Sequence, residues 1–238
     1  MKAIKRIALL LIALLVITPI VPVQAGTMEK EISLLVDGQL NNTDWFDAEG
    51  STYILEDKLV FPADGLESTR VISKSFAQMD TAYKNMVTLN AQIQLAQLPK
   101  NEKFIVAMGL DSIEALSGEP GNIEIEFTND GSLKMGVVYY EENGDANVIA
   151  EPKTIGIQTE EIFTLTLDAD VDGNLDIAIN GTVVFALTEV PGLEGRIGFL
   201  KTGHCGVNMF GGTVGFTHYD RPHNPNLTED FETELYNN

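Results

Sequence analysis

The stretch Val87-Thr-Leu-Asn-Ala-Gln-Ile-Gln-Leu95 alternates between apolar and polar side chains at every step. Successive side chains of a β-strand point to opposite faces, so this pattern predicts a half-buried strand with an outer face of Thr, Asn and Gln. The side chains predicted to face the core are Val87, Leu89, Ile93 and Leu95.

Short apolar runs separated by turn residues extend this pattern over most of the chain. Further strands are predicted at Tyr53–Phe61, Arg70–Phe76, Phe104–Leu110, Asn122–Phe127, Leu133–Tyr140, Ile162–Asp168, Leu175–Ile179, Thr182–Leu187, Arg196–Leu200 and Thr213–Tyr219. The breaks are rich in Asn, Asp and Gly, and Asn180-Gly181 joins two apolar runs directly, as hairpin turns do. Many short antiparallel strands without helices predict an all-β sandwich or barrel.

Four motifs late in the chain carry a resemblance to a known superfamily. They are Phe163-Thr-Leu-Thr-Leu-Asp168, Leu175-Asp-Ile-Ala-Ile-Asn180-Gly181, Gly195-Arg-Ile-Gly-Phe199 and Gly212-Thr-Val-Gly-Phe216. This succession is similar to the late strands of the concanavalin A-like lectin/glucanase superfamily, of the laminin-G-like kind. The resemblance extends from about Tyr53 to about Tyr219. It implies a two-sheet antiparallel jelly-roll sandwich and a glycan as the ligand.

The N-terminus has the order of a secretory signal peptide. Three basic residues precede an apolar run at 7–17, and a small-residue cleavage site ends at Ala25. Export and cleavage require this order, so we expect a signal peptide at 1–25 and a secreted or cell-surface protein. A retained membrane anchor is the alternative, but Pro19 and Pro22 would break a spanning helix near its end.

The rest of the chain is expected to hold one β-sandwich domain at 26–221 and an acidic tail or linker at 222–238. The end of the tail, Asp230-Phe-Glu-Thr-Glu-Leu-Tyr-Asn-Asn238, echoes Asp37-Gly-Gln-Leu-Asn-Asn-Thr-Asp-Trp45, since both are acidic and contain Leu and Asn-Asn. The start of a further unit and a chance likeness are both open. Cys205 is the only cysteine, so no intramolecular disulfide is expected.

The charge balance limits the partners. The chain has 15 Lys and Arg against 35 Asp and Glu, a formal net charge of −20. So acidic a chain repels nucleic acid and anionic membrane surfaces. We therefore expect no nucleic-acid partner and no membrane insertion after signal removal, which leaves glycans, cell-surface proteins and cations.

Glu124 and Glu126 are the candidate catalytic pair. They alternate within Ile123-Glu-Ile-Glu-Phe127. In a strand they share one face at a backbone separation of about 6.5–7 Å, which suits the two carboxyl groups of glycoside hydrolysis. Glucanases of the superfamily that the chain resembles commonly carry Glu-x-Asp-x-x-Glu or a shorter form, whereas here Glu124-x-Glu126 is followed by Thr128. The missing third acid argues against hydrolysis, and a solvated strand face is the alternative.

Asp168, Asp170 and Asp172 alternate just before Gly173 and are the candidate metal ligands. Alternating oxygen ligands with a glycine at the sharp turn resemble the first half of a calcium loop. The closing Glu of such a loop is absent, because Ile179 stands there. Calcium is the only candidate cofactor, and a plain hairpin tip, which favours the same residue types, is the alternative.

Aromatic rings are the candidate ligand-binding residues, since a sugar ring stacks on an aromatic face. Trp45 is the only tryptophan, and Tyr139 and Tyr140 are adjacent, so one of them is expected to face solvent. Packing in the core is the alternative for each ring. By the same alternation, Cys205 is expected to be buried and His204 exposed.

Three functions remain open. The first is a non-catalytic recognition module that binds a glycan or a cell-surface protein, with or without Ca²⁺. The second is a glycoside hydrolase that uses Glu124 and Glu126, and the third is a structural domain of a larger surface protein. Fold resemblance alone cannot decide among them. A polar cleft with aromatic walls around the two carboxylates would favour the hydrolase, and a flat exposed sheet would favour the module.

Overall fold

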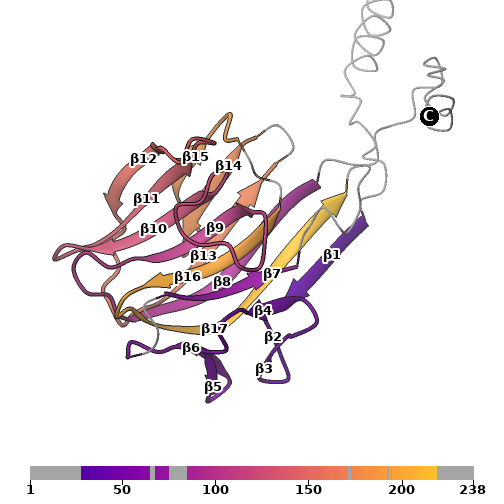
Figure 1. The fold of residues 1–238 in the computed structure, drawn as a ribbon, viewed down its shortest axis with the longest axis vertical. Helices are drawn as coiled ribbons and strands as arrows, with labels where there is room; N and C mark the ends of the chain where they lie inside the picture. Colours follow the sequence, from indigo (N-terminus) through magenta and orange to yellow (C-terminus); the bar gives the residue numbers. More distant parts are fainter. Residues whose placement is uncertain are drawn as a thin grey trace, which may run out of the picture. The chain divides into compact units, whose positions relative to one another are not determined.

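The computed structural model of the chain describes residues 28–64, 68–74, 85–170, 173–191, 193 and 195–218. These residues belong to one compact unit, Met28–Tyr219. They form seventeen strands and no helix, which confirms the all-β prediction (Figure 1). Within these ranges, therefore, there is no helix with the length and apolar character of a membrane span.

Eight strands form the first sheet. Seven of them lie in the order β15 (Thr182–Leu187), β14 (Leu175–Ile179), β13 (Ile162–Ala169), β8 (Asn85–Gln97), β17 (Gly206–His218), β6 (Lys58–Phe61) and β5 (Tyr53–Leu55). The eighth, β1 (Met28–Ser33), pairs with the C-terminal half of β17. The two longest strands, β8 and β17, pair with each other in the middle of this sheet (Figure 1).

Seven strands form the second sheet. Their order is β12 (Ala146–Thr154), β11 (Leu133–Tyr140), β10 (Ile123–Asn129), β9 (Phe104–Leu110), β16 (Arg196–Thr202), β7 (Ser68–Ser73) and β4 (Trp45–Asp47). A small hairpin of β2 (Leu35–Val36) and β3 (Gln39–Leu40) stands apart from both sheets. All pairings between the described strands are antiparallel, which confirms the predicted two-sheet antiparallel sandwich.

One hydrophobic core is built from the facing sides of the two sheets. The second sheet contributes a row of rings, in which Phe199 stacks on Trp45 at 5.6 Å and on Phe104 at 6.5 Å between ring centroids. The first sheet contributes the inward side chains of β8, each at most 6% exposed. They are the four that were predicted, Val87, Leu89, Ile93 and Leu95, together with Ala91.

The turns explain where the predicted strands hold and where they do not. Asn180 and Gly181 have φ angles of 50° and 75°, and they join β14 to β15 as the predicted hairpin. The predicted strand Tyr53–Phe61 is instead a hairpin of β5 and β6, because Glu56 and Asp57 adopt φ angles of 52° and 61°. Neither residue is Gly or Asn, so this turn lacked the usual signal.

Phe199→Ala is expected to lower the free energy of unfolding by about 3–5 kcal/mol, because it leaves a cavity between Trp45 and Phe104. Urea unfolding followed by circular dichroism measures the loss. Tyr53→Ala is the control, since that ring is 49% exposed on β5 and its loss should cost less than about 1 kcal/mol. Similar losses for the two variants would contradict the position of Phe199 in the core.

Candidate functional site

The side chains of Glu124 and Glu126 extend from β10 on the face of the seven-stranded sheet that points away from the core. Their neighbours Ile123, Ile125 and Phe127 alternate into the core. The outward face also carries a second buried apolar cluster, which consists of Ile72, Ile105, Ala107, Leu110, Ala115 and Leu200. Ala115 belongs to the loop of residues 111–122 between β9 and β10, so this loop covers part of the outward face.

Glu124 is buried beneath this loop, with 0% of its surface exposed. The hydroxyl of Ser117 donates a hydrogen bond to Oε2 at 2.9 Å, and the backbone N–H of Gly118 donates one to Oε1 at 2.7 Å. Burial raises the pKa of the Glu124 carboxyl, and the two hydrogen bonds offset that rise only in part. The carboxyl therefore fastens the loop to the sheet and has no contact with solvent.

Glu126 lies two residues further along the same face and has a different environment. Its Oε1 accepts a hydrogen bond from the ammonium of Lys103 at 2.6 Å. The side chain of Glu126 is 12% exposed and that of Lys103 is 37% exposed. This ion pair is at the margin of the covered area, so the two glutamates do not share one open site.

Tyr139 and Tyr140 point to opposite faces of β11. Tyr139 is partly buried and packs against the core. Tyr140 is partly buried on the outward face, where its ring lies 3.6 Å from the position that a Cβ on Gly118 would take. Burial, together with the charges of Glu124 and Glu126, raises the pKa of Tyr140 to about 12. Tyr140 is therefore a neutral wall of the closed site.

Taken together, these groups have part of the chemistry of an acid–base pair. One carboxyl has a raised pKa and its neighbour is paired with a cation, which is the asymmetry that glycosidases use. A general acid must also come within hydrogen-bonding distance of its substrate. Glu124 cannot do so while the loop is in place, because Ser117 and Gly118 occupy its oxygens.

Sequence reasoning did not identify Lys103, Ser117 or the covering loop as parts of this site. One signal was available, since Phe104-Ile-Val-Ala-Met108 is apolar at every position. A strand that is apolar on both faces is buried on both faces. The outward side of β9 therefore had to be covered by something, although the sequence did not say by which segment.

The acidic turn between β13 and β14 is described in part, because Asp172 lies outside the described residues. Thr88 Oγ1 donates a hydrogen bond to Asp168 at 2.7 Å. The carboxylate of Asp170 accepts from the backbone N–H of Asn174 at 3.0 Å and from its side-chain amide at 2.7 Å. Among the described residues no group of three or more potential metal ligands occurs. Asp170 thus acts as a turn cap, and calcium stays a prediction.

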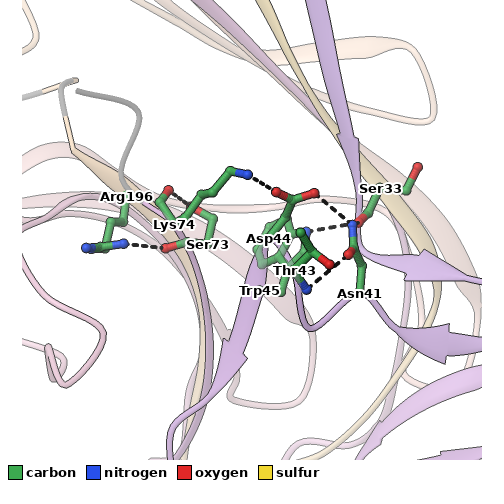
Figure 2. A network of polar contacts seen from close by, with 8 residues as sticks. All are labelled: Ser33, Asn41, Thr43, Asp44, Trp45, Ser73, Lys74 and Arg196. Carbon is green, nitrogen blue, oxygen red and sulfur yellow. Dashed lines mark hydrogen bonds and ion pairs between the residues drawn. The ribbon is translucent and has the colours of Figure 1, made fainter. Parts of the chain in front are cut away.

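Trp45 is packed in the core and is 1% exposed. Its indole N–H donates a hydrogen bond to the carbonyl of Ser33 at 3.1 Å. Figure 2 shows the polar network around it, in which the Asn41 amide donates to the same carbonyl and to Asp44, and Lys74 forms an ion pair with Asp44. The indole is enclosed, so Trp45 is not available to stack on a sugar ring.

Cys205 is buried and His204 is exposed, as predicted. The thiol donates a hydrogen bond to the carbonyl of Lys103 at 3.3 Å. Burial raises the pKa of Cys205 to about 12, so the thiolate needed for a nucleophile is not formed at neutral pH. A Cys–His catalytic pair is therefore not part of this site.

No family model matches the chain, and no curated protein matches it. Solved structures do match. The carbohydrate recognition domain of Emp47p is 12% identical over 80% of this chain and 95% of its own, with a TM-score of 0.56. A native glycosidic hydrolase is 12% identical over 83% of this chain and all of its own, with a TM-score of 0.59. The potassium-bound carbohydrate recognition domain of Emp46p is 13% identical over 76% and 92%, with a TM-score of 0.54.

These similarities show that the chain has the concanavalin A-like jelly-roll fold. At such low identity they show the fold alone. Because the same fold occurs in carbohydrate recognition domains and in a hydrolase, its function has to be argued from the residues of this chain.

Glu124→Gln is expected to change how stability depends on pH. Because the pKa of Glu124 is raised in the folded state, that state holds its proton more tightly than the unfolded chain does. This group therefore makes the free energy of unfolding fall as the pH rises from about 4.5, its ordinary value, through the raised one. The glutamine cannot ionise, so the variant should gain stability relative to the natural protein above that window.

Melting temperatures between pH 4 and 8 measure this difference. Glu126→Gln is the matched control, because it makes the same change two residues away but removes an ion pair. It should not gain stability as the pH rises. Parallel curves for the natural protein and Glu124→Gln would contradict the burial of this carboxyl.

Proposed function

We propose that the protein is a secreted or cell-surface recognition module that binds glycans and does not cleave them. This proposal rests on one observation: both candidate acids, Glu124 and Glu126, are engaged in contacts within the protein. Glu124 is fully buried and fastens the loop at 111–122, and Glu126 pairs with Lys103. Neither carboxyl is placed to meet a sugar chain, whereas a hydrolase needs both at its substrate.

The glycan part of the proposal is supported by the fold and by the charge. The similar structures include two carbohydrate recognition domains, of Emp47p and Emp46p. The formal net charge of −20 disfavours polyanionic ligands and places no such barrier against neutral sugars. The order of residues at the N-terminus supports export, where extracellular glycans are met.

A glycoside hydrolase is the second candidate, and one observation favours it. The pKa of Glu124 is raised beside Glu126, which is an arrangement suited to a proton donor and its partner. This candidate requires the loop at 111–122 to move off the sheet when a substrate binds. The loop would then lose the hydrogen bonds of Ser117 and Gly118 to Glu124 and the apolar contacts of Ala115.

Calcium belongs to the proposal as an assisting ion at the β13–β14 turn. Asp168 and Asp176 lie directly opposite each other on neighbouring strands, and both are exposed. Like charges in such cross-strand pairs are destabilising, and a cation would relieve the repulsion.

The protein is expected to bind immobilised glycans and to release no reducing sugar from a panel of polysaccharides. A glycan array and a reducing-sugar assay on the purified protein measure the two properties. Glu124→Gln and Glu126→Gln are the controls. Turnover that either variant abolishes would contradict the proposal and favour the hydrolase, and an array without any bound glycan would contradict the recognition function.

If the turn holds calcium, millimolar Ca²⁺ should raise the melting temperature above that in a chelator. A ligand at a hundredfold excess over its dissociation constant adds about 2.7 kcal/mol to the free energy of unfolding. Asp168→Asn should reduce this shift, while Asp111→Asn, an exposed change in the loop after β9, should keep it. Equal melting temperatures with calcium and with chelator would remove calcium from the proposal.

A further inference from the structure

At its centre the outward face of the eight-stranded sheet is polar and open, unlike the covered face of the other sheet. Exposed Ile162 and Val183 lie on the same face, on β13 and β15. The antiparallel register aligns the outward residues of β8 with those of its two neighbours. In one row Asn90 is the Cα partner of Thr166 and Thr213, and in another Gln94 is the partner of Asn208. We call the set the amide strip: Asn90, Gln92 and Gln94 of β8, Thr164 and Thr166 of β13, and Asn208 and Thr213 of β17.

The amide strip carries no charge in a chain whose formal net charge is −20. Acidic charge lies in the row next to it, where Thr88 pairs with Asp168 on one side and with Gly215 on the other. Asp168 accepts the hydroxyl hydrogen of Thr88. A positive charge also lies nearby, since the ammonium of Lys58 is 5.8 Å from the ring centroid of Phe210 on β17. A ligand that lies along the strip thus meets neutral hydrogen-bonding groups, which can serve as both donors and acceptors.

Hydrogen bonds within the strip orient some of its side chains. Thr166 Oγ1 donates to Asn90 Oδ1 at 2.9 Å, and Asn208 Nδ2 donates to Gln94 Oε1 at 2.7 Å. Gln92 is exposed and has no side-chain hydrogen bond to any other described residue. The amide of Gln92 is therefore available to a ligand, between neighbours whose own positions are fixed.

Beside the strip, β17 has room above its backbone. A Cβ added to Gly211 would meet nothing within 4 Å, and one added to Gly215 would meet only the carbonyl of Thr88 at 3.9 Å. At the far end, the row of Asn208 continues through Val60 to Tyr53. Tyr53 is 49% exposed and lies on the same face of the sheet, two strands from Asn208, with the buried Val60 between them.

We propose that the amide strip and Tyr53 form the binding surface for a neutral polysaccharide chain. This inference rests on the proposed function and assigns the glycan-binding site to the outward face of the eight-stranded sheet. The hydroxyls of such a chain donate and accept hydrogen bonds as the amides do, and the apolar face of a sugar ring can stack on Tyr53. From Asn208 to Thr213 the strand extends over roughly 17 Å, enough for several sugar units.

A second copy of the protein is a poorer occupant of this face. The centre of a protein–protein interface is enriched in apolar and aromatic side chains, whereas the centre of this surface consists of amides and hydroxyls. Polyanionic glycans fit less well than neutral ones, because Asp168 and Glu31 border the surface at the row of Gly215.

Gly215→Val tests the surface by adding bulk to its open floor. The added side chain has space, and Gly215 is not among the glycines with positive φ, so the variant should fold. Gln92→Ala removes an amide and Tyr53→Ala removes the ring. Each variant should bind a soluble neutral β-glucan, xyloglucan or galactomannan about tenfold more weakly than the natural protein, measured by retardation in native gels that contain the polysaccharide.

Ala186→Val is the matched control, because it also introduces a valine, at an exposed position of β15 on the same sheet. The polysaccharides should retard this control as much as they retard the natural protein. The melting temperature of every variant should lie within a few degrees of that of the natural protein. Polygalacturonate, a polyanion, should cause no retardation.

The outcomes separate this inference from the proposed function. If neutral polysaccharides retard the natural protein and the three variants equally, the inference is overturned and glycan binding stands. If none of them retards the natural protein, the inference is overturned, and a glycan array that is also empty overturns the function. A loss of self-association in Gly215→Val, measured by sedimentation, would show that a second copy occupies the face.

Discussion

The register of β8 is the constraint on which the rest of the structure depends. This strand pairs with β13 on one edge and β17 on the other. A slip by one residue would turn Ile93 to solvent and carry Gln92 and Gln94 into the core. Buried amides without partners cost several kcal/mol together, so the register is strongly fixed. The same register that closes the core therefore aligns the polar rows on the outer face.

One outer face of the sandwich is covered and the other is exposed, because the central strands of the two sheets have different outward side chains. The outward side of β9 has Ile105 and Ala107, so that face needs a cover, and the loop at 111–122 supplies it. The cover then removes Glu124 from water, and hydrogen bonds from the loop offset part of the cost. From Thr88 to Ala96 the outward side of β8 has only polar residues and an alanine, so this part of the face requires no cover.

Local patterns in the sequence were enough to predict the parts of the fold that local interactions decide. The alternation from Val87 to Leu95 and the turn at Asn180-Gly181 are examples, and both are confirmed. Features that depend on distant partners were not predictable in this way. Trp45 is enclosed because β4 pairs with β7, and Glu124 is covered because the loop at 111–122 packs on residues from β7, β9 and β16. The turn at residues 56 and 57 was not predicted for a different reason, since the backbone of Glu56 and Asp57 adopts positive φ angles, which usually indicate glycine.

The buried Cys205 gives the fold a built-in reporter of its own opening. The chain has no other thiol, and this one lies between β16 and β17 with its hydrogen bonded to the carbonyl of Lys103. A thiol reagent can react with it only in molecules whose neighbouring strands have separated, because reagents need the thiolate and direct access to it. The labelling rate therefore measures how often this part of the sandwich opens. The same shielding prevents Cys205 from linking two copies of the chain through an intermolecular disulfide while the sandwich is closed.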